Sequence, residues 1–415
     1  MVDRPANTPL LLVMFPYKFI EFYYTKLELN YFPPYCEVAV WDISQLVNRN
    51  FSDAIAGERS QRPNVVVVAK WTDFIRRVLE LRLQYTTSQL YVVDYISNGP
   101  EFLTSLIVKY LLRKQNVTFI ERSNGGIPLY YPVASTGGAL SSQQPTKLSK
   151  IRMFFTTLST FTELIIRLQY NFFRALARWL PSATTYRLVA GEHYMVQAIR
   201  QHPRTAKLVL GHSEDYSNFI IGSTKNVTVP RIKHAVYLDG GGPLFSGDNI
   251  QTGGIMSETC AMWYPALSNF LQKLETERSL VVHISGHPKS AHPPAPDYFG
   301  KRAVRYGMTQ DLVRNSELVI TIASTATSYA VLYRKPLIFI YSTQTKSNLQ
   351  QMKNIWSMAA FLGTKPVNID QPPWNFAELL QVNETCYEAY EKACLTSAGP
   401  PRPNYQIILE DILKL

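Results

Sequence analysis

The sequence lacks several features that mark well-defined protein classes. No apolar run approaches the roughly 20 residues that cross a bilayer, so we expect a soluble protein or one that lies on a membrane surface. The 4 cysteines are scattered without metal-ligand spacing, and zinc-finger spacing, RNP-like strands and a lysine-rich tail are missing. The chain also has no DxD signature of the kind that holds a divalent cation. We therefore expect neither a metal site nor a nucleic-acid partner.

The first residues favour a strand over an export signal. An acidic residue stands beside the arginine, and the apolar run that follows is short. Without export, free thiols in a reducing compartment and a cytoplasmic location are expected.

The chain contains enough apolar residues to form the cores of two domains of ordinary size. Hydrophobic residues make up 46% of its 415 residues, too many for a disordered chain. Lys and Arg exceed Asp and Glu by 42 − 31 = 11 charges. A surplus of this size indicates an anionic partner, such as acidic lipid headgroups or a phosphorylated substrate.

In the first part of the chain, strand-like apolar runs alternate with helical stretches. The runs are residues 10–15, 36–42, 64–70, 90–96 and 117–122, and the helical stretches include 17–29, 71–83 and 101–113. This alternation predicts a parallel sheet covered by helices on both faces. Residues 187–192 and 207–211 look like its last strands, which would place Glu192, Glu214 and Asp215 at the carboxyl edge of the sheet, where they could serve in acid–base chemistry.

The second part contains three strand-like runs that each end in polar residues. Residues 234–238 run into Asp239 and three glycines, which let a backbone approach a ligand closely. Residues 280–284 run into the sequence GHPK, where His287 and Lys289 can reach a phosphate. Residues 318–322 are followed by a Ser/Thr-rich helix start containing Ser324 and Thr325, which predicts an anion cradle. Together these features predict a site for the phosphate of a nucleotide sugar.

These motifs carry a resemblance to a known family. The sequences WYP (263–265), VVHISGHPKS (281–290) and NSELVITIASTATSYAVLYRKPLIFI (315–340) resemble the C-terminal half of bacterial surface-polysaccharide glycosyltransferases of the GT-B type. The likeness covers about residues 229–341. It is greatest to enzymes that use CMP-activated acidic sugars, namely the Kdo transferases of lipopolysaccharide and capsule assembly, and more distant to bacterial sialyltransferases. Those enzymes share an HP motif, a Ser/Thr motif and an acidic motif upstream.

The resemblance implies an α/β fold with two Rossmann-like domains that face a central cleft. It also implies a CMP-sugar donor, whose single leaving phosphate needs no divalent cation and no further cofactor. The implied nucleotide-binding residues are Gly240, His287, Pro288, Lys289, Ser324 and Thr325.

Asp239 matches the acidic motif and takes the role of catalytic carboxylate. It would act as a general base if the enzyme inverts and as a nucleophile if it retains. That motif often has two adjacent acids, and Leu238 stands in one place here, so Asp248 or Glu258 could supply the second acid. Glu192 is a further catalytic candidate.

Residues 147–187 form an unusual basic segment. Apolar residues such as Phe155, Phe172 and Trp179 recur at helical spacing, and seven basic residues stand against a single acid, Glu163. Such a segment is typical of a helix on an anionic membrane surface, although a helix packed on the protein core has the same pattern.

We expect an acceptor domain over residues 1–228, with the basic segment as an insertion, and a donor domain over 229–400. Residues 401–415 are expected to form a helix that can cross back to the first domain. The predicted function is transfer of Kdo or a related sugar to a glycan, or to a lipid-linked glycan, in lipopolysaccharide, O-antigen or capsule synthesis. The alternatives are a UDP-sugar-dependent transferase or epimerase of the same fold, and a non-catalytic scaffold on a membrane.

Overall fold

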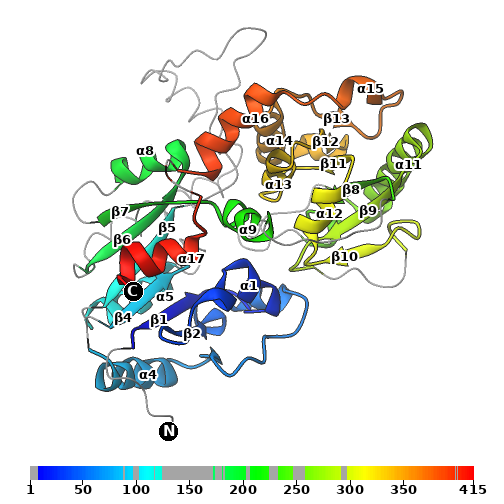
Figure 1. Cartoon of the computed structure of the whole chain (residues 1–415). Helices are drawn as coiled ribbons and strands as arrows, with labels where there is room; N and C mark the ends of the chain where they lie inside the picture. Colours follow the sequence, from blue (N-terminus) through cyan, green and yellow to red (C-terminus); the bar gives the residue numbers. More distant parts are fainter. Residues whose placement is uncertain are drawn as a thin grey trace.

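The computed structural model of the chain consists of two α/β domains and a returning C-terminal segment (Figure 1). The described residues are 8–86, 89–96, 102–115, 117–123, 183–201, 206–223, 232–245, 258–290, 297–397 and 401–415, with Phe172, Leu180 and Gly399. The predicted domain boundary near residue 229 lies outside the described residues, as does nearly all of the basic segment 147–187.

The first domain is built on a parallel sheet with the described strand order β3-β2-β1-β4-β5-β6-β7. The strands are β1 (Leu10–Phe15), β2 (Glu37–Asp42), β3 (Val65–Val67), β4 (Leu90–Asp94), β5 (Thr118–Ser123), β6 (Thr185–Ala190) and β7 (Ala206–Gly211). Side chains alternate between the two faces of a strand, and both faces of β1 are buried. Leu11 and Val13 pack into one core, whereas Leu10 and Leu12 pack into the other.

Helices cover both faces of this sheet. They are α1 (Glu21–Lys26), α2 (Ser44–Val47), α3 (Arg49–Ala54), α4 (Trp71–Gln84), α5 (Phe102–Arg113), α8 (Gly191–Gln201) and α9 (Glu214–Ser223). The helices α4 and α5 bury Phe74 and Val108 in the core on one face, and α1 buries Tyr23 in the core on the other. The expected strands and crossover helices are therefore present.

The second domain has a parallel sheet with the described order β10-β9-β8-β11-β12-β13. Its strands are β8 (His234–Leu238), β9 (Val281–Gly286), β10 (Val304–Tyr306), β11 (Leu318–Thr321), β12 (Leu337–Tyr341) and β13 (Val367–Asn368). Its helices are α11 (Cys260–Arg278), α12 (Thr309–Asn315), α13 (Thr327–Leu332), α14 (Leu349–Phe361), α15 (Phe376–Leu379) and α16 (Glu384–Tyr390). One core joins the sheet to α11 through Phe270 and Leu274 and to α14 through Ile355 and Met358.

After α16 the chain returns to the first domain. The π-helical turn η5 (Glu391–Leu395) lies against α8, where a Cβ on Gly191 would come within 2.4 Å of the Ala393 carbonyl oxygen. The helix α17 (Asn404–Ile407) and the turn η6 (Ile408–Leu413) lie over the first sheet (Figure 1). Their residues Ile408 and Ile412 are buried in the same core as Val13 and Ile120. The last residues of the chain thus complete the first domain.

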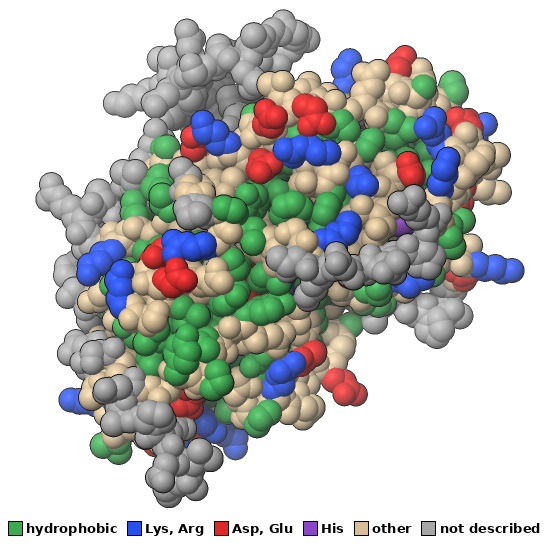
Figure 2. Space-filling view, in the orientation of Figure 1, with side chains coloured by type: hydrophobic (Ala, Val, Ile, Leu, Met, Phe, Trp, Pro, Cys, Tyr) green, Lys and Arg blue, Asp and Glu red, His purple; other side chains and the backbone are tan. Residues whose placement is uncertain are grey.

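The two sheets have the strand order of doubly wound Rossmann-like domains, so the expected fold class is confirmed. None of the helices in the described part of the chain is long and apolar enough to span a membrane. On the face shown in Figure 2, Lys and Arg side chains lie beside Asp and Glu side chains instead of gathering into one basic field.

Candidate functional site

The strand order places the predicted site residues at the switch point of the second sheet. The strand β9 lies on one side of β8 and β11 lies on the other, so the carboxyl ends of β8 and β11 form the switch point at which open α/β sheets bind ligands. Asp239 directly follows β8, and Ser324 follows β11 by three residues. The structure therefore brings the acidic motif and the Ser/Thr motif to one edge.

The loop after β8 is fixed by a backbone hydrogen bond at its start, and its backbone is accessible at Gly240. Asp239 is 6% exposed, and its backbone N–H donates to the Ser285 carbonyl oxygen at 3.0 Å. A Cβ on Gly240 would meet no atom within 4 Å, so the backbone there can approach a ligand. Gly241 and Gly242 have φ values of +90° and +49°, a left-handed conformation that favours glycine. Glycine is thus required for the shape of this loop.

The imidazole of His287 is held by its own turn. Its Nδ1 accepts the backbone N–H of Lys289 at 3.2 Å, and the His287 carbonyl accepts the Ser290 N–H at 3.0 Å. Its ring lies 5.2 Å from that of Phe245, and Pro288 fixes the backbone between His287 and Lys289. Because Nδ1 accepts, a neutral His287 carries its proton on Nε2. The ring can therefore act as a donor through Nε2.

Lys289 lies in an aromatic cage formed by the first domain. Its Nζ is 4.9 Å from the ring centre of Tyr17, 5.2 Å from that of Phe51 and 6.0 Å from that of Tyr23. Its carbonyl oxygen accepts the backbone N–H of Ala56 at 2.9 Å. The ammonium group that we expected at a phosphate thus makes cation–π contacts that join the two domains.

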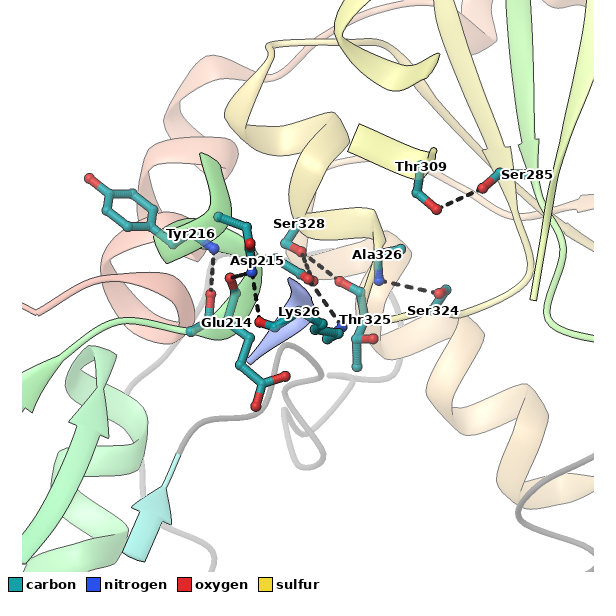
Figure 3. A network of polar contacts seen from close by, with 12 residues as sticks. Lys26, Glu214, Asp215, Tyr216, Ser285, Thr309, Ser324, Thr325, Ala326 and Ser328 are labelled. Carbon is teal, nitrogen blue, oxygen red and sulfur yellow. Dashed lines mark hydrogen bonds and ion pairs between the residues drawn. The ribbon is translucent and has the colours of Figure 1, made fainter. Parts of the chain in front are cut away.

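The Ser/Thr loop before α13 is held from the first domain, as Figure 3 shows. The Ser328 hydroxyl lies 2.6 Å from Oδ2 of Asp215 and 2.6 Å from the Thr325 carbonyl oxygen. The Ser324 hydroxyl oxygen accepts the backbone N–H of Ala326 at 3.2 Å. Since Asp215 belongs to α9 and Ser328 to α13, one carboxylate fixes the predicted phosphate loop across the domain boundary.

Lys26, in the last turn of α1, pairs with the same carboxylate. Its Nζ lies 3.3 Å from Oδ1 of Asp215, and the two side chains are 26% and 8% exposed. Burial lowers the pKa of the Lys26 ammonium, but the charges of Asp215 and Glu214 more than compensate, so its pKa is raised overall. Lys26 therefore stays charged at neutral pH and keeps Asp215 paired.

A second buried charge cluster lies at the carboxyl edge of the first sheet. Arg122 projects from β5, donates to the Tyr95 hydroxyl and lies 3.3 Å from the Glu214 carboxylate. Nearby Glu28 is 1% exposed, and its carboxylate accepts the backbone N–H of Tyr405 at 2.8 Å. Burial raises the pKa of Glu28. This edge of the first domain, which we expected to contact the acceptor, is thus lined with charged groups.

Two other candidate acids lie in different surroundings. Glu192, in the first turn of α8, is 67% exposed and pairs with Lys392 at 3.1 Å, and no described contact joins it to Asp239. Glu258 is 9% exposed and lies close enough to Tyr237 to influence its titration. Asp248 lies outside the described residues.

Sequence reasoning missed Lys26, Glu28 and Arg122. Their roles depend on contacts between elements that are distant in sequence, and the only local signal is a charged Arg122 at the end of an apolar strand. Among the described residues, no three His, Cys, Asp or Glu side chains gather as a metal site.

Comparisons with known proteins find similar solved structures but no relative by sequence. No protein-family profile matches the chain, and no curated protein matches it by sequence. Three similar solved structures are S. aureus MnaA with UDP, a Methanocaldococcus jannaschii UDP-GlcNAc 2-epimerase with UDP-GlcNAc and UDP, and the glycosyltransferase SnogD from Streptomyces nogalater. Each is 10% identical to this chain, and in the order named the TM-scores are 0.47, 0.44 and 0.42. In the same order, the alignments cover 98%, 96% and 97% of this chain and 97%, 98% and 99% of the other chain. Likeness at this level says nothing about substrate, and the fold described above rests on the sheet topology.

Proposed function

We propose that the chain is a glycosyltransferase of the GT-B type that takes its sugar from a nucleotide-activated donor. One observation carries the proposal: the carboxyl edges of the two Rossmann-like sheets meet, with Asp239 and the Ser324–Ser328 loop on one side and Lys26 and Asp215 on the other. A crevice at the carboxyl edge of such a sheet is the general ligand site of open α/β domains. We assign the donor to the second domain and the acceptor to the first.

The leaving phosphate would be met by hydrogen-bond donors of this chain. His287 can donate through Nε2, Ser324 and Thr325 through their hydroxyls, and the open Gly240 through its backbone N–H. Donors fixed in place before the reaction stabilise developing negative charge without reorganising. Held by its turn, His287 meets this requirement.

Asp239 would act on the acceptor or on the sugar itself. Its carboxylate either accepts the proton of the acceptor hydroxyl as that hydroxyl displaces the nucleotide phosphate, which inverts the anomeric carbon, or itself displaces the phosphate. In the second case the acceptor hydroxyl then displaces the carboxylate from the glycosyl intermediate, and two inversions retain the configuration. Glu192, paired with Lys392 on α8, is the second candidate for this role. Exchange of Asp239 and of Glu192 for the corresponding amide, one at a time, shows which of the two acids is required.

The identity of the donor nucleotide is a more specific part of the proposal. The sequence resemblance favours a CMP-activated acidic sugar such as Kdo, and a UDP-sugar transferase or epimerase is the alternative. Two of the similar solved structures are described as UDP complexes, so UDP-sugars belong in the same assay.

Nucleotide release from CMP-, UDP- and GDP-sugars tests the proposal. We expect release from one donor class, dependent on acceptor, and loss of turnover in Asp239→Asn with nucleotide affinity retained. Glu277→Gln is the matched control, since Glu277 is an exposed carboxylate on α11 that pairs only with Lys273 among the described contacts. Release without acceptor, together with a rearranged sugar, would indicate an epimerase. No release and no nucleotide binding would refute the proposal.

We also propose that the acceptor is a lipid-linked glycan at an anionic membrane surface. This part rests on the sequence of residues 147–187, whose Phe and Trp side chains can enter the headgroup boundary while its cations attract acidic lipids. Co-sedimentation with anionic liposomes at low salt should depend on Arg167, Arg174 and Arg178. If exchange of all three for Glu leaves binding unchanged, the membrane part fails.

A further inference from the structure

Three buried polar side chains surround the loop that carries Asp239. Tyr237 is 0%, Trp263 is 1% and Tyr264 is 3% exposed. Within the part of the chain that the structure describes, the Tyr237 hydroxyl, the Trp263 Nε1 and the Tyr264 hydroxyl make no hydrogen bond of good geometry, although the Trp263 indole lies close enough to the Tyr237 hydroxyl to lower the pKa of that phenol. A buried donor left unmatched is destabilising, and native proteins contain few of them. Three in one place therefore require a functional explanation.

Two elements of the second domain aim these groups at the loop. Tyr237 precedes Asp239 by two residues at the end of β8, so the two side chains leave the backbone on the same side. Trp263 and Tyr264 lie in the first turns of α11. A Cβ on Gly242 would lie 3.3 Å from the Tyr264 hydroxyl and 3.4 Å from the Trp263 Nε1. The phenol and the indole N–H thus both face the loop.

Electrostatics agree with this geometry. Burial, followed by the negative charge of Asp239, raises the pKa of both Tyr237 and Tyr264 well above its ordinary value. Both phenols are therefore protonated at physiological pH and can donate a hydrogen bond to a water molecule or a carboxylate. The other groups that influence these phenols are Glu258, Cys260, Tyr298 and Tyr306.

We propose that Tyr237, Trp263 and Tyr264 are positioning residues that donate hydrogen bonds to the carboxylate of Asp239 through bridging water molecules. The proposal rests on the assignment of Asp239 as the catalytic carboxylate. Asp239 is 6% exposed, and hydrogen bonds to the charged form of a buried carboxylate favour that form. The three residues would hold Asp239 ionised, as a base or nucleophile must be, and fix its orientation toward the crevice.

Single-atom deletions test the proposal. We expect Tyr237→Phe and Tyr264→Phe each to lower kcat by roughly 10- to 100-fold, the factor for losing one hydrogen bond to a charged group. The KM for the donor should change less than about twofold, because these groups act on Asp239 and not on the nucleotide. The acidic limb of the kcat profile should move to higher pH, because the ionised carboxylate loses stabilisation.

A matched control lies in the same aromatic cluster. Tyr298 stacks on Tyr264 with ring centres 4.3 Å apart, so Tyr298→Phe makes the same chemical change beside the proposed group. We expect it to leave kcat and the acidic limb unchanged. If Tyr237 and Tyr264 merely filled space, removing their unmatched hydroxyls would raise the melting temperature and leave kcat and the pH profile as they are. That result would overturn the proposal.

A readout without turnover separates this proposal from the proposed function. Carbon-13 NMR of aspartate carboxyls, with Asp239→Asn to assign the signal, gives the pKa of Asp239 directly. We expect that pKa to rise in Tyr264→Phe and to stay unchanged in Tyr298→Phe. If Asp239→Asn keeps full turnover while Tyr264→Phe still raises the pKa, the catalytic assignment fails and the hydrogen bonds stand. If neither phenol changes the pKa, the hydrogen bonds fail.

Discussion

Replacing Asp215 should uncouple the two domains at the predicted phosphate loop. Asp215→Ala removes the acceptor for the Ser328 hydroxyl at 2.6 Å and the partner of Lys26 at 3.3 Å. A hydrogen bond to a charged group contributes about 1.5–3 kcal/mol, and removing one partner of a buried ion pair costs about 3–5 kcal/mol.

The expected loss is smaller than the sum of these two terms. The Lys26 side chain is 26% exposed, so its ammonium recovers some hydration when its partner is lost, and Glu214 remains near it. We therefore expect the free energy of unfolding to fall by about 3 kcal/mol, at the lower end of the range for a broken buried pair. Asp215→Asn should cost less, because the amide oxygen can still accept from Ser328.

Urea denaturation measures this loss, and nucleotide titration shows whether the loop is disturbed. The matched control is Asp53→Ala, whose partner Arg49 lies at 3.8 Å with side-chain exposures of 72% and 60%, so its effect should stay below about 0.5 kcal/mol. The ion pair between Lys26 and Asp215 should also stop stabilising the protein at high pH. Because the pKa of Lys26 is raised in the folded state, the stability that the pair contributes is fully present below about pH 10.4. That stability is lost as the pH rises through the pKa of Lys26 in the folded state. A change under 0.5 kcal/mol in Asp215→Ala, with unchanged nucleotide affinity, would refute this reasoning.

Three further predictions concern other parts of the site. His287→Ala should weaken nucleotide binding by roughly 10- to 100-fold in calorimetry, because a charge-assisted donor is lost, and unchanged affinity would contradict the assignment. Glu28→Gln should become more stable relative to wild type as the pH rises from 4 to 7. The pKa of Glu28 is raised in the folded state, so the wild type loses stability once this carboxyl ionises in the unfolded state. Parallel plots of unfolding free energy against pH for the two proteins would contradict this. Lys289→Met should increase the radius of gyration in X-ray scattering, since Met fills the aromatic cage without a cation, whereas Lys289→Arg should not.

The fold could be predicted from the sequence because its central strands are buried on both faces. Runs such as residues 10–15 and 318–322 are almost purely apolar, and polar residues mark where each run ends. For the same reason Asp239, His287 and Ser324 were expected at one edge, which the parallel pairing of β8 with β9 and β11 explains.

The ends of the helices and the cross-domain contacts could not be predicted in this way. The stretch 17–29 was expected to be one helix, but α1 covers only Glu21–Lys26. The backbone N–H of Phe19 donates to Asp42 at 3.1 Å, and Glu28 has a left-handed φ of 63°. Contacts such as Lys289 with Tyr17 join residues far apart in sequence, and no local pattern encodes them.

The return of the chain to its first domain has a consequence for how the protein is made. Ile408 and Ile412 fill a core whose other members, such as Val13 and Ile120, are synthesised much earlier. At about 5–20 residues per second, a ribosome needs roughly 10–40 s to make the stretch from α9 to η6. Throughout that interval an apolar face of the first sheet stays uncovered in the nascent chain. A premature stop codon that removes only residues 404–415 would therefore leave two complete sheets and a protein that chaperones and proteases recognise as unfinished.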